Sequence, residues 1–411
     1  ILFLNFNSLR QYLRNNLPDG VKVQVKELVF GKKYLNEISV YRKQNYNSKI
    51  LPTTQFEYLN LEKFQLTNFK PTDQIHYGKI KGTGITTKKF FIEPTSQGLL
   101  TVYYNGEISL IGDLDNFNQK TLNSNLDNFF IKSVLDIAVI KDKLFISYSF
   151  NQENEKKCSY LGVVETNLEL SNLSFKNIFK TKTCLENTLG GRMHYYNHLN
   201  NEGFLLTTGA SGEVKNLAQI DDSYYGKILF FNLKNYESII FTKGHRNPQG
   251  LTINNGIILE TEHGEYGGDE INKIVFKNNY GFPISSYGDQ YDFDEILDNR
   301  FNYSFKKSHI RNNFYEPIYS FVPSIGISEI IKIPEEFSKY WIDNYFITSL
   351  NGRSIYRVKF DNSFSKILFI EKIYVGERIR DIKYLKEKNV LALALEESGS
   401  IGILKTPQSY K

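Results

Sequence analysis

The chain has 411 residues, of which 41% are hydrophobic, 15% aromatic and 23% charged. This length and apolar content are sufficient for a large buried core. The formal net charge is only +5, and basic residues are interleaved with acidic ones, so the composition does not indicate a nucleic-acid-binding protein. No stretch reaches the roughly 18 consecutive apolar residues that indicate a membrane-spanning helix.

The N-terminal segment is predicted to contain a short helix. Apolar residues recur at helical spacing within residues 8–17, and the Pro-Asp-Gly sequence at 18–20 would end the helix. Its other face carries Arg10 and Arg14, and several lysines follow. A basic helix of this kind could lie on a membrane surface or pack against the rest of the protein. Residues 1–6 are largely apolar and could be the end of a signal or anchor segment that lies upstream.

A different pattern begins at about residue 85, where short apolar runs are separated by turns rich in Gly, Asn and Asp. Many runs form hairpin-like pairs, such as 134–140 with 143–150. Groups of runs recur about every 40 to 60 residues, which is a spacing typical of four-stranded propeller blades. The sequence therefore predicts an all-β fold, a six-bladed β-propeller formed by residues 86–411. Residues 1–85 are predicted to be a partly helical N-terminal extension that packs on the propeller.

A β-sandwich is the alternative fold, but so many tight hairpins would require several sandwiches in succession. Long helical periodicity is nearly absent after the first segment. Short helices are expected only at residues 294–299 and 334–339.

The chain contains two cysteines, Cys158 and Cys184, which lie in neighbouring segments near predicted strands. Two cysteines are too few for a metal cluster or a disulfide scaffold. A disulfide and a pair of free thiols both remain open from the sequence.

The richest stretch of the sequence lies between residues 244 and 283. It reads Gly-His-Arg-Asn-Pro-Gln-Gly at 244–250, Glu-His-Gly-Glu-Tyr-Gly-Gly-Asp-Glu-Ile-Asn at 262–272 and Asn-Tyr-Gly-Phe-Pro at 279–283. Polar and charged residues and glycines are concentrated between short strand-like runs. This arrangement predicts a site built on loops that a rigid scaffold holds in place.

These three blocks, together with Gly-Gly-Arg-Met at 190–193 and Arg-Ile-Arg-Asp at 378–381, resemble the glucose/sorbosone dehydrogenase family. The resemblance extends from about residue 95 to about residue 405. It implies a six-bladed propeller that oxidises aldose sugars with pyrroloquinoline quinone (PQQ) held by calcium. It also implies export to the periplasm or the outside of the cell.

The resemblance implies that Arg246, Asn247, Arg378 and Arg380 hold the cofactor. PQQ carries three carboxylates, and the forked guanidinium group of arginine suits planar carboxylates. Asn247 matches the family residue that donates to the quinone oxygens. A structural role is the alternative for Arg378 and Arg380, because arginines that alternate on a strand often pair with an Asp or Glu of a neighbouring blade.

Four further residues match the calcium-binding positions of the family. Gly264 and Glu265 match the loop whose backbone carbonyls hold the calcium of the cofactor, and Asp269 and Glu270 match positions associated with a second, structural calcium. Glycine would let the backbone turn its carbonyl oxygens toward the ion. The alternative for Asp269 and Glu270 is hydrogen bonding to the amides of the tight turn.

Three positions depart from the family pattern at the reacting centre. Thr188 occupies the position of the histidine base, Asn351 replaces the cofactor-binding lysine, and Ile325–Ile327 replace an aromatic residue near the substrate. A threonine hydroxyl does not titrate near neutral pH and cannot act unaided as a general base. His194 is the best substitute base, because it would face the same side of a strand as Arg192.

Two functions remain open from the sequence. The first is a quinoprotein that oxidises a sugar or another alcohol with PQQ and calcium through an altered active site. The second is a non-catalytic propeller that binds a small anion, a glycan or a protein partner at the same place. The altered residues favour the second function and the retained arginines favour the first. The sequence indicates neither the substrate nor the oligomeric state.

Overall fold

The computed structural model describes residues 48–54, 58–67, 75–76, 86–87, 89–151, 158–185, 188–265, 267–288 and 309–407. The helices predicted at 8–17 and 294–299 lie outside these residues. The helix predicted at 334–339 is wrong, because this segment forms turns. Its backbone is held by isolated hydrogen bonds to the carbonyl of Pro334, and so short a segment cannot offset the cost of starting a helix.

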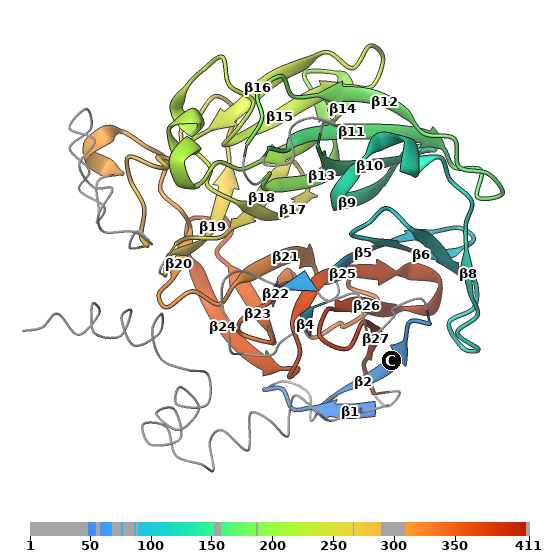
Figure 1. Ribbon diagram of the computed structural model, residues 1–411. Coiled ribbons are helices and arrows are strands. Elements are labelled where there is room, and N and C mark those ends of the chain that lie inside the picture. The colour runs from blue at the N-terminus through green and yellow to red at the C-terminus, as the bar shows by residue number, and fades with distance from the viewer. Residues whose placement is uncertain are drawn as a thin grey trace, which may run out of the picture.

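The strands form a closed ring of six sheets, which confirms the predicted six-bladed β-propeller (Figure 1). Each sheet is antiparallel and runs from an inner to an outer strand. The first blade comprises β5 (Phe90–Thr95), β6 (Gly98–Tyr103), β7 (Ile108–Ile111) and β8 (Gln119–Thr121). The second comprises β9 (Ile131–Ile140), β10 (Lys143–Phe150), β11 (Tyr160–Asn167) and β12 (Lys176–Lys180), and the third β13 (Gly190–His198), β14 (Asn201–Thr208), β15 (Lys227–Asn232) and β16 (Ser238–Lys243).

The remaining blades follow the same order along the chain. The fourth comprises β17 (Pro248–Asn254), β18 (Ile257–Glu262), β19 (Asp269–Ile274) and β20 (Tyr319–Phe321), and the fifth β21 (Ile327–Lys332), β22 (Asn344–Ser349), β23 (Ser354–Phe360) and β24 (Ile367–Tyr374). The sixth contains β25 (Ile379–Leu385), β26 (Val390–Leu395) and β27 (Ser400–Lys405). Short 3-10 helices η1 (Leu126–Phe129), η2 (Gly212–Gln219), η4 (Ile310–Asn312) and η5 (Lys386–Lys388) lie in the connections.

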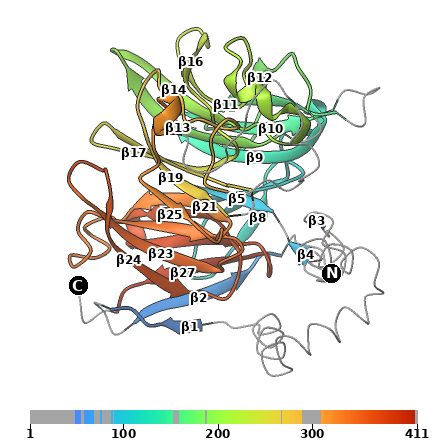
Figure 2. The same ribbon diagram turned by 90° about the vertical axis from the view of Figure 1, so that its left-hand side faces the viewer.

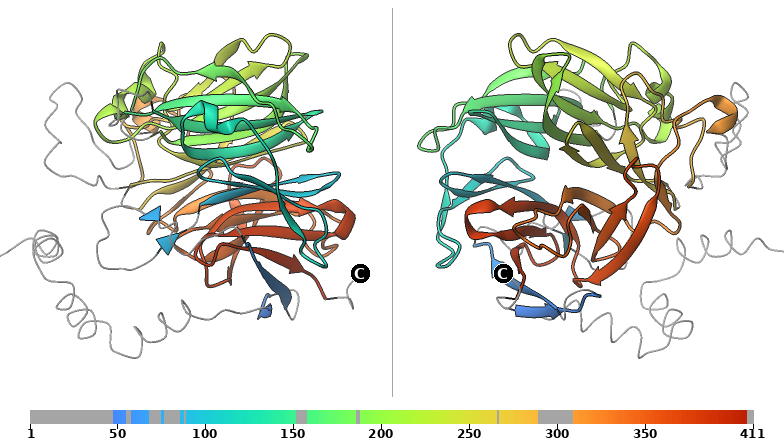
Figure 3. Two further views of the ribbon diagram at one scale, coloured as in Figure 1. Left: turned by 45° about the vertical axis from the view of Figure 1, so that its right-hand side comes forward. Right: turned by 180° about the vertical axis from the view of Figure 1, so that it is seen from behind.

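Two strands from the beginning of the chain complete the sixth blade. Its order is β1-β2-β27-β26-β25, where β1 is Ser48–Leu51 and β2 is Leu59–Gln65. Asn60 of β2 pairs with Lys405 of β27, so the two ends of the chain close the ring. Figures 2 and 3 show the blue β1 and β2 against the red strands. Part of the segment that was expected to be an extension is therefore the outer half of a blade. A small hairpin of β3 (Ile75–His76) and β4 (Thr86–Thr87) follows.

The hydrophobic core lies between neighbouring blades and holds the inner strands around the axis. Leu61 of β2, Ile355 of β23 and Leu393 of β26 belong to one buried cluster, which joins the fifth blade to the sixth. Trp341 is fully buried in the same cluster. Because each blade covers an apolar face of the next, the ring is a rigid frame for the residues that surround its centre.

Two further findings concern covalent bonding and membranes. Cys158 and Cys184 are joined by a disulfide, with 5.5 Å between their Cα atoms. Among the residues that the structure describes, none forms a helix long and apolar enough to cross a membrane.

Candidate functional site

The residues predicted from the sequence gather at one mouth of the ring. In antiparallel blades, the start of the first strand and the loop between the second and third strands lie at the same end. Thr188, Arg246 and Arg378 directly precede the inner strands β13, β17 and β25. The 263–268 loop joins β18 to β19, and Asn351 lies between β22 and β23. We call this end of the propeller the mouth.

Arg192 lies in the inner strand β13 and points toward the centre of the ring. In the sequence it is recognisable only as part of a family motif. Its guanidinium is almost fully buried, and Nη1 lies 3.1 Å from Asp136 Oδ1, 3.2 Å from Glu329 Oε2 and 3.6 Å from Asp381 Oδ1. These acids come from the inner strands β9, β21 and β25. Burial raises the pKa of Glu329 to about 7, although Arg192 opposes this shift.

Arg192 also contacts the two remaining inner strands. Its Nε donates to the carbonyl of Gln249 in β17 at 2.6 Å, and its guanidinium lies 4.8 Å from the centre of the Phe91 ring in β5. Arg192, which lies in the third blade, therefore touches the inner strand of each of the five other blades. The signal in the sequence was a charged residue within a buried strand, but the partners lie too far away in the chain to be recognised.

Arg378 and Arg380 share one carboxylate in their own blade. Glu396 is completely buried and accepts from Arg378 Nε at 3.2 Å and from Arg380 Nε at 2.6 Å. Burial pushes the pKa of Glu396 upward, but Arg380 and Arg378 outweigh this effect and hold the pKa below its usual value. Both arginines are therefore paired with an acid, as the structural alternative expected, but this acid belongs to their own blade and not to a neighbouring one.

A chain of hydrogen bonds links Arg380 to the predicted cofactor residues of the fourth blade. Arg380 Nη1 donates to Gln249 Oε1 at 2.9 Å, and Gln249 Nε2 donates to Asn247 Oδ1 at 2.9 Å. Next to Asn247, Arg246 Nη1 donates to the carbonyl of His263 at 2.9 Å. The carboxylate of Glu265 lies 3.7 Å from Arg246 Nε. The structure thus brings Arg380 together with Arg246 and Asn247, which lie in a distant part of the sequence.

The 263–268 loop is held by Asp269. One carboxylate oxygen of Asp269 accepts from the backbone N–H of Gly264 at 3.1 Å, and the other accepts from Ile325 at 2.9 Å and Ile327 at 3.0 Å. A Cβ on Gly264 would lie 2.2 Å from the carbonyl oxygen of Gly267, so only glycine fits there. Asp269 is thus engaged by turn amides, which is the alternative role expected for it, and is poorly placed to bind a metal.

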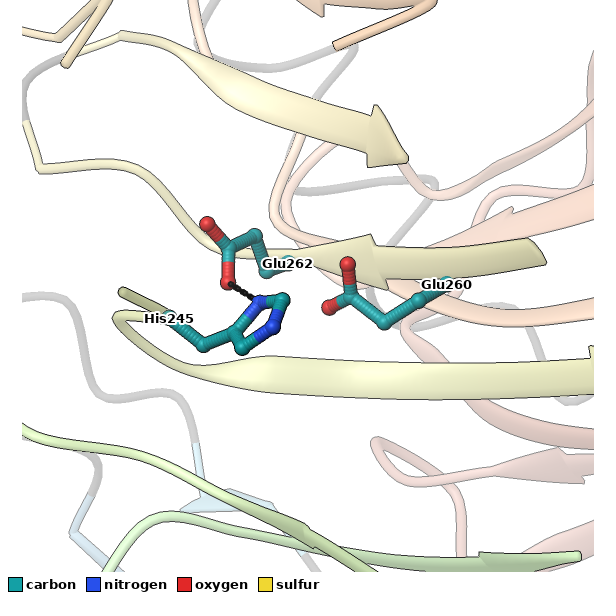
Figure 4. A group of neighbouring side chains, drawn as sticks. All are labelled: His245, Glu260 and Glu262. Carbon is teal, nitrogen blue, oxygen red and sulfur yellow. Dashed lines mark ion pairs between the residues drawn. The ribbon is translucent and has the colours of Figure 1, made fainter. Parts of the chain in front are cut away.

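A buried acidic cluster lies behind this loop and was only partly predicted. The side chains of Glu260 and Glu262 of β18 lie next to that of His245 (Figure 4). One ring nitrogen of His245 and one carboxylate oxygen from each glutamate lie within 4.8 Å of one another, so the three could bind one ion together. Glu262 Oε2 lies 3.4 Å from His245 Nδ1. Glu270, predicted as a metal ligand, is linked to Glu260 because both accept from Asn272 Nδ2. The alternation Glu260-Thr261-Glu262 in a strand was the missed signal, because it places both acids on one face.

With all its carboxylates ionised, the acidic cluster would carry more negative charge than its buried surroundings neutralise. Burial, reinforced by Glu262, raises the pKa values of Glu260 and Glu270 well above the usual value. Burial also raises the pKa of Glu262 to about 7 and lowers that of His245 to about 3. Glu260 Oε1 and Asn272 Oδ1 are buried without a hydrogen-bond partner among the described residues. A hard cation with oxygen ligands, such as calcium, fits this donor set.

A narrow pocket connects the cluster to the mouth. It is lined by Arg246, Glu262, Gly264, Glu270 and Tyr280, among others, and has room for little more than a water molecule or one ion. This pocket is suited to a cation, while a larger ligand would have to lie above it, at the mouth itself.

Thr188 and Asn351, which are expected from the sequence to depart from the family pattern, lie in different surroundings. Thr188 Oγ1 lies 3.1 Å from Ser159 Oγ, and Asn351 is exposed in its turn. His194 lies two residues beyond Arg192, which is about 7 Å further along β13 and away from the mouth. Burial lowers its pKa, and its Nδ1 lies 2.9 Å from the carbonyl of Tyr195. This position gives His194 little support as a substitute base at the mouth.

Comparison with known proteins agrees with this architecture. The sequence model of the glucose/sorbosone dehydrogenase family matches residues 133–404, so the chain belongs to this family, as its motifs predicted. The aldose sugar dehydrogenase YliI of Escherichia coli is 24% identical over 293 residues, which cover 65% of this chain and 76% of that protein. An uncharacterised protein of Synechocystis sp. is 27% identical over 164 residues, and the match spans only 38% of that protein.

Solved structures show the same fold at low sequence identity. A crystal structure of a glucose dehydrogenase is similar with a TM-score of 0.64 and 21% identity, covering 78% of this chain and 96% of that one. The PQQ-bound form of an aldose sugar dehydrogenase from Streptomyces coelicolor has a TM-score of 0.56 and 16% identity, covering 84% and 98% of the two chains. At this identity the likeness establishes the propeller and leaves the ligand to be argued from the site.

Proposed function

We propose that this chain binds PQQ and calcium at the mouth and oxidises a sugar or another alcohol through an altered active site. Family membership supports the reaction class, and a related propeller is named for its PQQ-bound form. The observation that carries the proposal is the hydrogen-bonded series Arg380–Gln249–Asn247 beside Arg246, directly above the acidic cluster. It supports the proposal, because guanidinium groups that could bind an anionic cofactor lie next to carboxylates that could bind a cation.

Each group has a defined role in this proposal. Arg246, Arg378 and Arg380 would bind carboxylates, because guanidinium groups form paired hydrogen bonds with them. Asn247 Oδ1 is occupied by Gln249 and by the N–H of Gly190, so its amide N–H group is the part that can donate to a ligand. Glu260, Glu262 and Glu270 would hold the calcium, and the Gly264–Glu265 backbone would supply carbonyls. When bound, PQQ would supply an ortho-quinone that accepts hydride.

The altered residues predict slow turnover of ordinary aldoses. Thr188 is neutral and hydrogen-bonded to Ser159, so it is unable to take the proton of a substrate hydroxyl. A general base usually contributes roughly 10²–10⁴-fold to the rate. The same observation favours the second candidate function, a non-catalytic propeller that binds an anion, a glycan or a protein partner. Export to the periplasm or outside the cell also belongs to the proposal and is supported by the Cys158–Cys184 disulfide.

One titration distinguishes these functions. The full chain is loaded with calcium, titrated with PQQ while absorbance is followed, and then given an aldose and a dye acceptor. A saturable spectral change followed by dye reduction supports the dehydrogenase. A spectral change without dye reduction supports the second function, a non-catalytic propeller, with PQQ as the bound anion. The absence of any spectral change would overturn the proposed cofactor.

A further inference from the structure

Lys89 is a lysine at the mouth that the family motifs do not account for. It directly precedes β5, the inner strand of the first blade, and its side chain is partly buried. Its carbonyl accepts from the N–H of Tyr104, at the start of the loop between β6 and β7. Both features place Lys89 at the same end of the ring as Arg246 and Arg378.

Among the residues that the structure describes, no carboxylate forms an ion pair with the ammonium of Lys89. Nζ donates to Ser133 Oγ at 3.3 Å and lies 5.4 Å from the centre of the Phe91 ring. The guanidinium of Arg192 lies 4.8 Å from the centre of the same Phe91 ring, so one ring packs against both cationic side chains. Within the described ranges, no ion pair of 4.0 Å or less includes Lys89.

The two acids that favour the charged form of Lys89, Glu396 and Asp136, are already engaged. Glu396 accepts from Arg378 and Arg380, and Asp136 accepts from Arg192 and from the N–H of Met193. Lys89 therefore faces Arg380 and Arg192 together with two acids whose oxygens serve other donors. Burial, followed by repulsion from Arg380, lowers its pKa to about 7, while Glu396 opposes the shift. An ammonium in such surroundings would gain from an additional anion.

We infer that Lys89 is a ligand-contact residue whose ammonium binds a carboxylate of the anionic ligand at the mouth. The inference rests on the proposed function and names a contact that the family motifs do not contain. Asn351, which replaces the cofactor-binding lysine, carries no charge. Lys89 supplies a cation to the same mouth from the first blade instead of the fifth.

The inference has a consequence for pH dependence. A carboxylate beside Nζ would favour the charged form of Lys89 and raise its pKa in the complex. Ligand affinity should therefore fall as the pH rises above about 7, where the free protein loses this proton. The charged groups that face Lys89 and influence its titration are Asp136, Arg192, Arg380 and Glu396.

The test compares Lys89→Met and Lys89→Arg with Lys120→Met. Lys120 is exposed in β8, the outer strand of the same blade, and serves as the matched control. PQQ affinity of the calcium-loaded full chain is measured by absorbance at pH 6.5 and 8.5, and folding of each variant by thermal unfolding. Lys89→Met should weaken binding about 10- to 100-fold at pH 6.5, the usual effect of losing a charged hydrogen bond. Lys89→Arg and Lys120→Met should remain within about threefold of the parent chain.

The outcomes separate the inference from the proposed function. If the parent chain binds PQQ and a folded Lys89→Met variant binds it equally well, the inference is overturned. If the parent chain binds no PQQ, the proposed function fails, and citrate replaces PQQ as a tricarboxylate probe. The pKa of reductively ¹³C-methylated Lys89 is then followed by NMR, with Lys89→Arg identifying the signal. A rise in this pKa with citrate supports the contact, and an unchanged pKa overturns it.

Discussion

Arg192 and Asp136 form an ion pair in the middle of the propeller, with 3.1 Å between Nη1 and Oδ1. Both side chains are almost fully buried, and Asp136 also accepts from the N–H of Met193 at 2.8 Å. The pair joins β9 to β13, and the remaining contacts of Arg192 reach the inner strands of the other blades. A single side chain therefore connects all six blades.

Replacing Arg192 with methionine should destabilise the protein by about 3–5 kcal/mol, since removal of one partner leaves buried charges without compensation. The acids left behind are Asp136, Glu329 and Asp381. Equilibrium unfolding in urea at pH 7 measures the loss, which should shrink at lower pH because the carboxylates can take up protons. Lys141→Met is the control, because its ion pair with Glu202 is on the surface and should contribute little. A loss below about 1 kcal/mol for Arg192→Met would contradict the role of Arg192.

The propeller could be predicted because its signal is local. Hairpin pairs such as 134–140 with 143–150 repeat along the chain, and each repeat is one half of a blade. The closure of the ring could not be predicted, since β2 pairs with a strand more than 300 residues later, as Asn60 with Lys405 shows. A local pattern reveals that a segment is extended but not which distant strand it joins.

The residues of the candidate site also fall into two groups, those that a local sequence motif predicted and those that it did not. Arg246 and Asn247 were found because they stand in a short, recognisable block. Arg192, Glu260 and Lys89 were missed because their roles depend on neighbours from other strands or blades. The resemblance also could not show that Glu396 holds both Arg378 and Arg380, since only the folded sixth blade brings these three residues together.

Calcium should stabilise the protein, and more strongly near pH 7.5 than near pH 5. Burial raises the pKa of Glu262 to about 7, so between about pH 4.5 and 7 the folded state binds a proton that the unfolded state has lost. This contribution to stability is present at low pH and disappears as the pH rises through that window. Calcium would replace the proton as the neutralising charge, and protons would compete with it at low pH.

Thermal unfolding from pH 4.5 to 8, with calcium or with a chelator, measures this effect. Glu262→Gln should reduce both the pH dependence and the calcium-induced rise in Tm, because the amide neither titrates nor carries charge. Glu237→Gln is the surface control, because Glu237 is exposed, and it should leave both unchanged. An equal calcium effect in the parent chain and in Glu262→Gln would place the ion elsewhere.

Reducing the Cys158–Cys184 disulfide should lower stability by about 2–4 kcal/mol, because the bond closes a loop between residues 26 positions apart. The Cys158→Ser, Cys184→Ser double variant should show the same loss without a reductant. Urea unfolding with and without dithiothreitol provides the measurement. Reductant should have no effect on the double variant, and a large effect there would show that the loss in the parent chain has another origin.

Restoring a base at the mouth should restore sugar oxidation if the altered residues are what limit it. Thr188 lies two residues before β13, and its hydroxyl is held by Ser159, so a histidine there would start from the position expected for the family base. Thr188→His combined with Asn351→Lys should raise the PQQ-dependent rate of dye reduction with an aldose by roughly 10²–10⁴-fold. The increase should follow a single ionisation near neutral pH, as expected for an imidazole base.

The matched control for this experiment is Thr188→Val with Asn351→Lys, which has the second change but no titratable group at position 188. This control should bind PQQ at least as tightly as the parent chain and remain slow, since added cationic charge improves binding of a carboxylate ligand without supplying a base. Steady-state kinetics of both double variants, with PQQ affinity measured in parallel, separate binding from turnover. If PQQ binds to the histidine variant but the rate stays at the level of the valine variant, Thr188 is not the limiting residue. The mouth would then be a binding site in which the remaining groups are not arranged for hydride transfer.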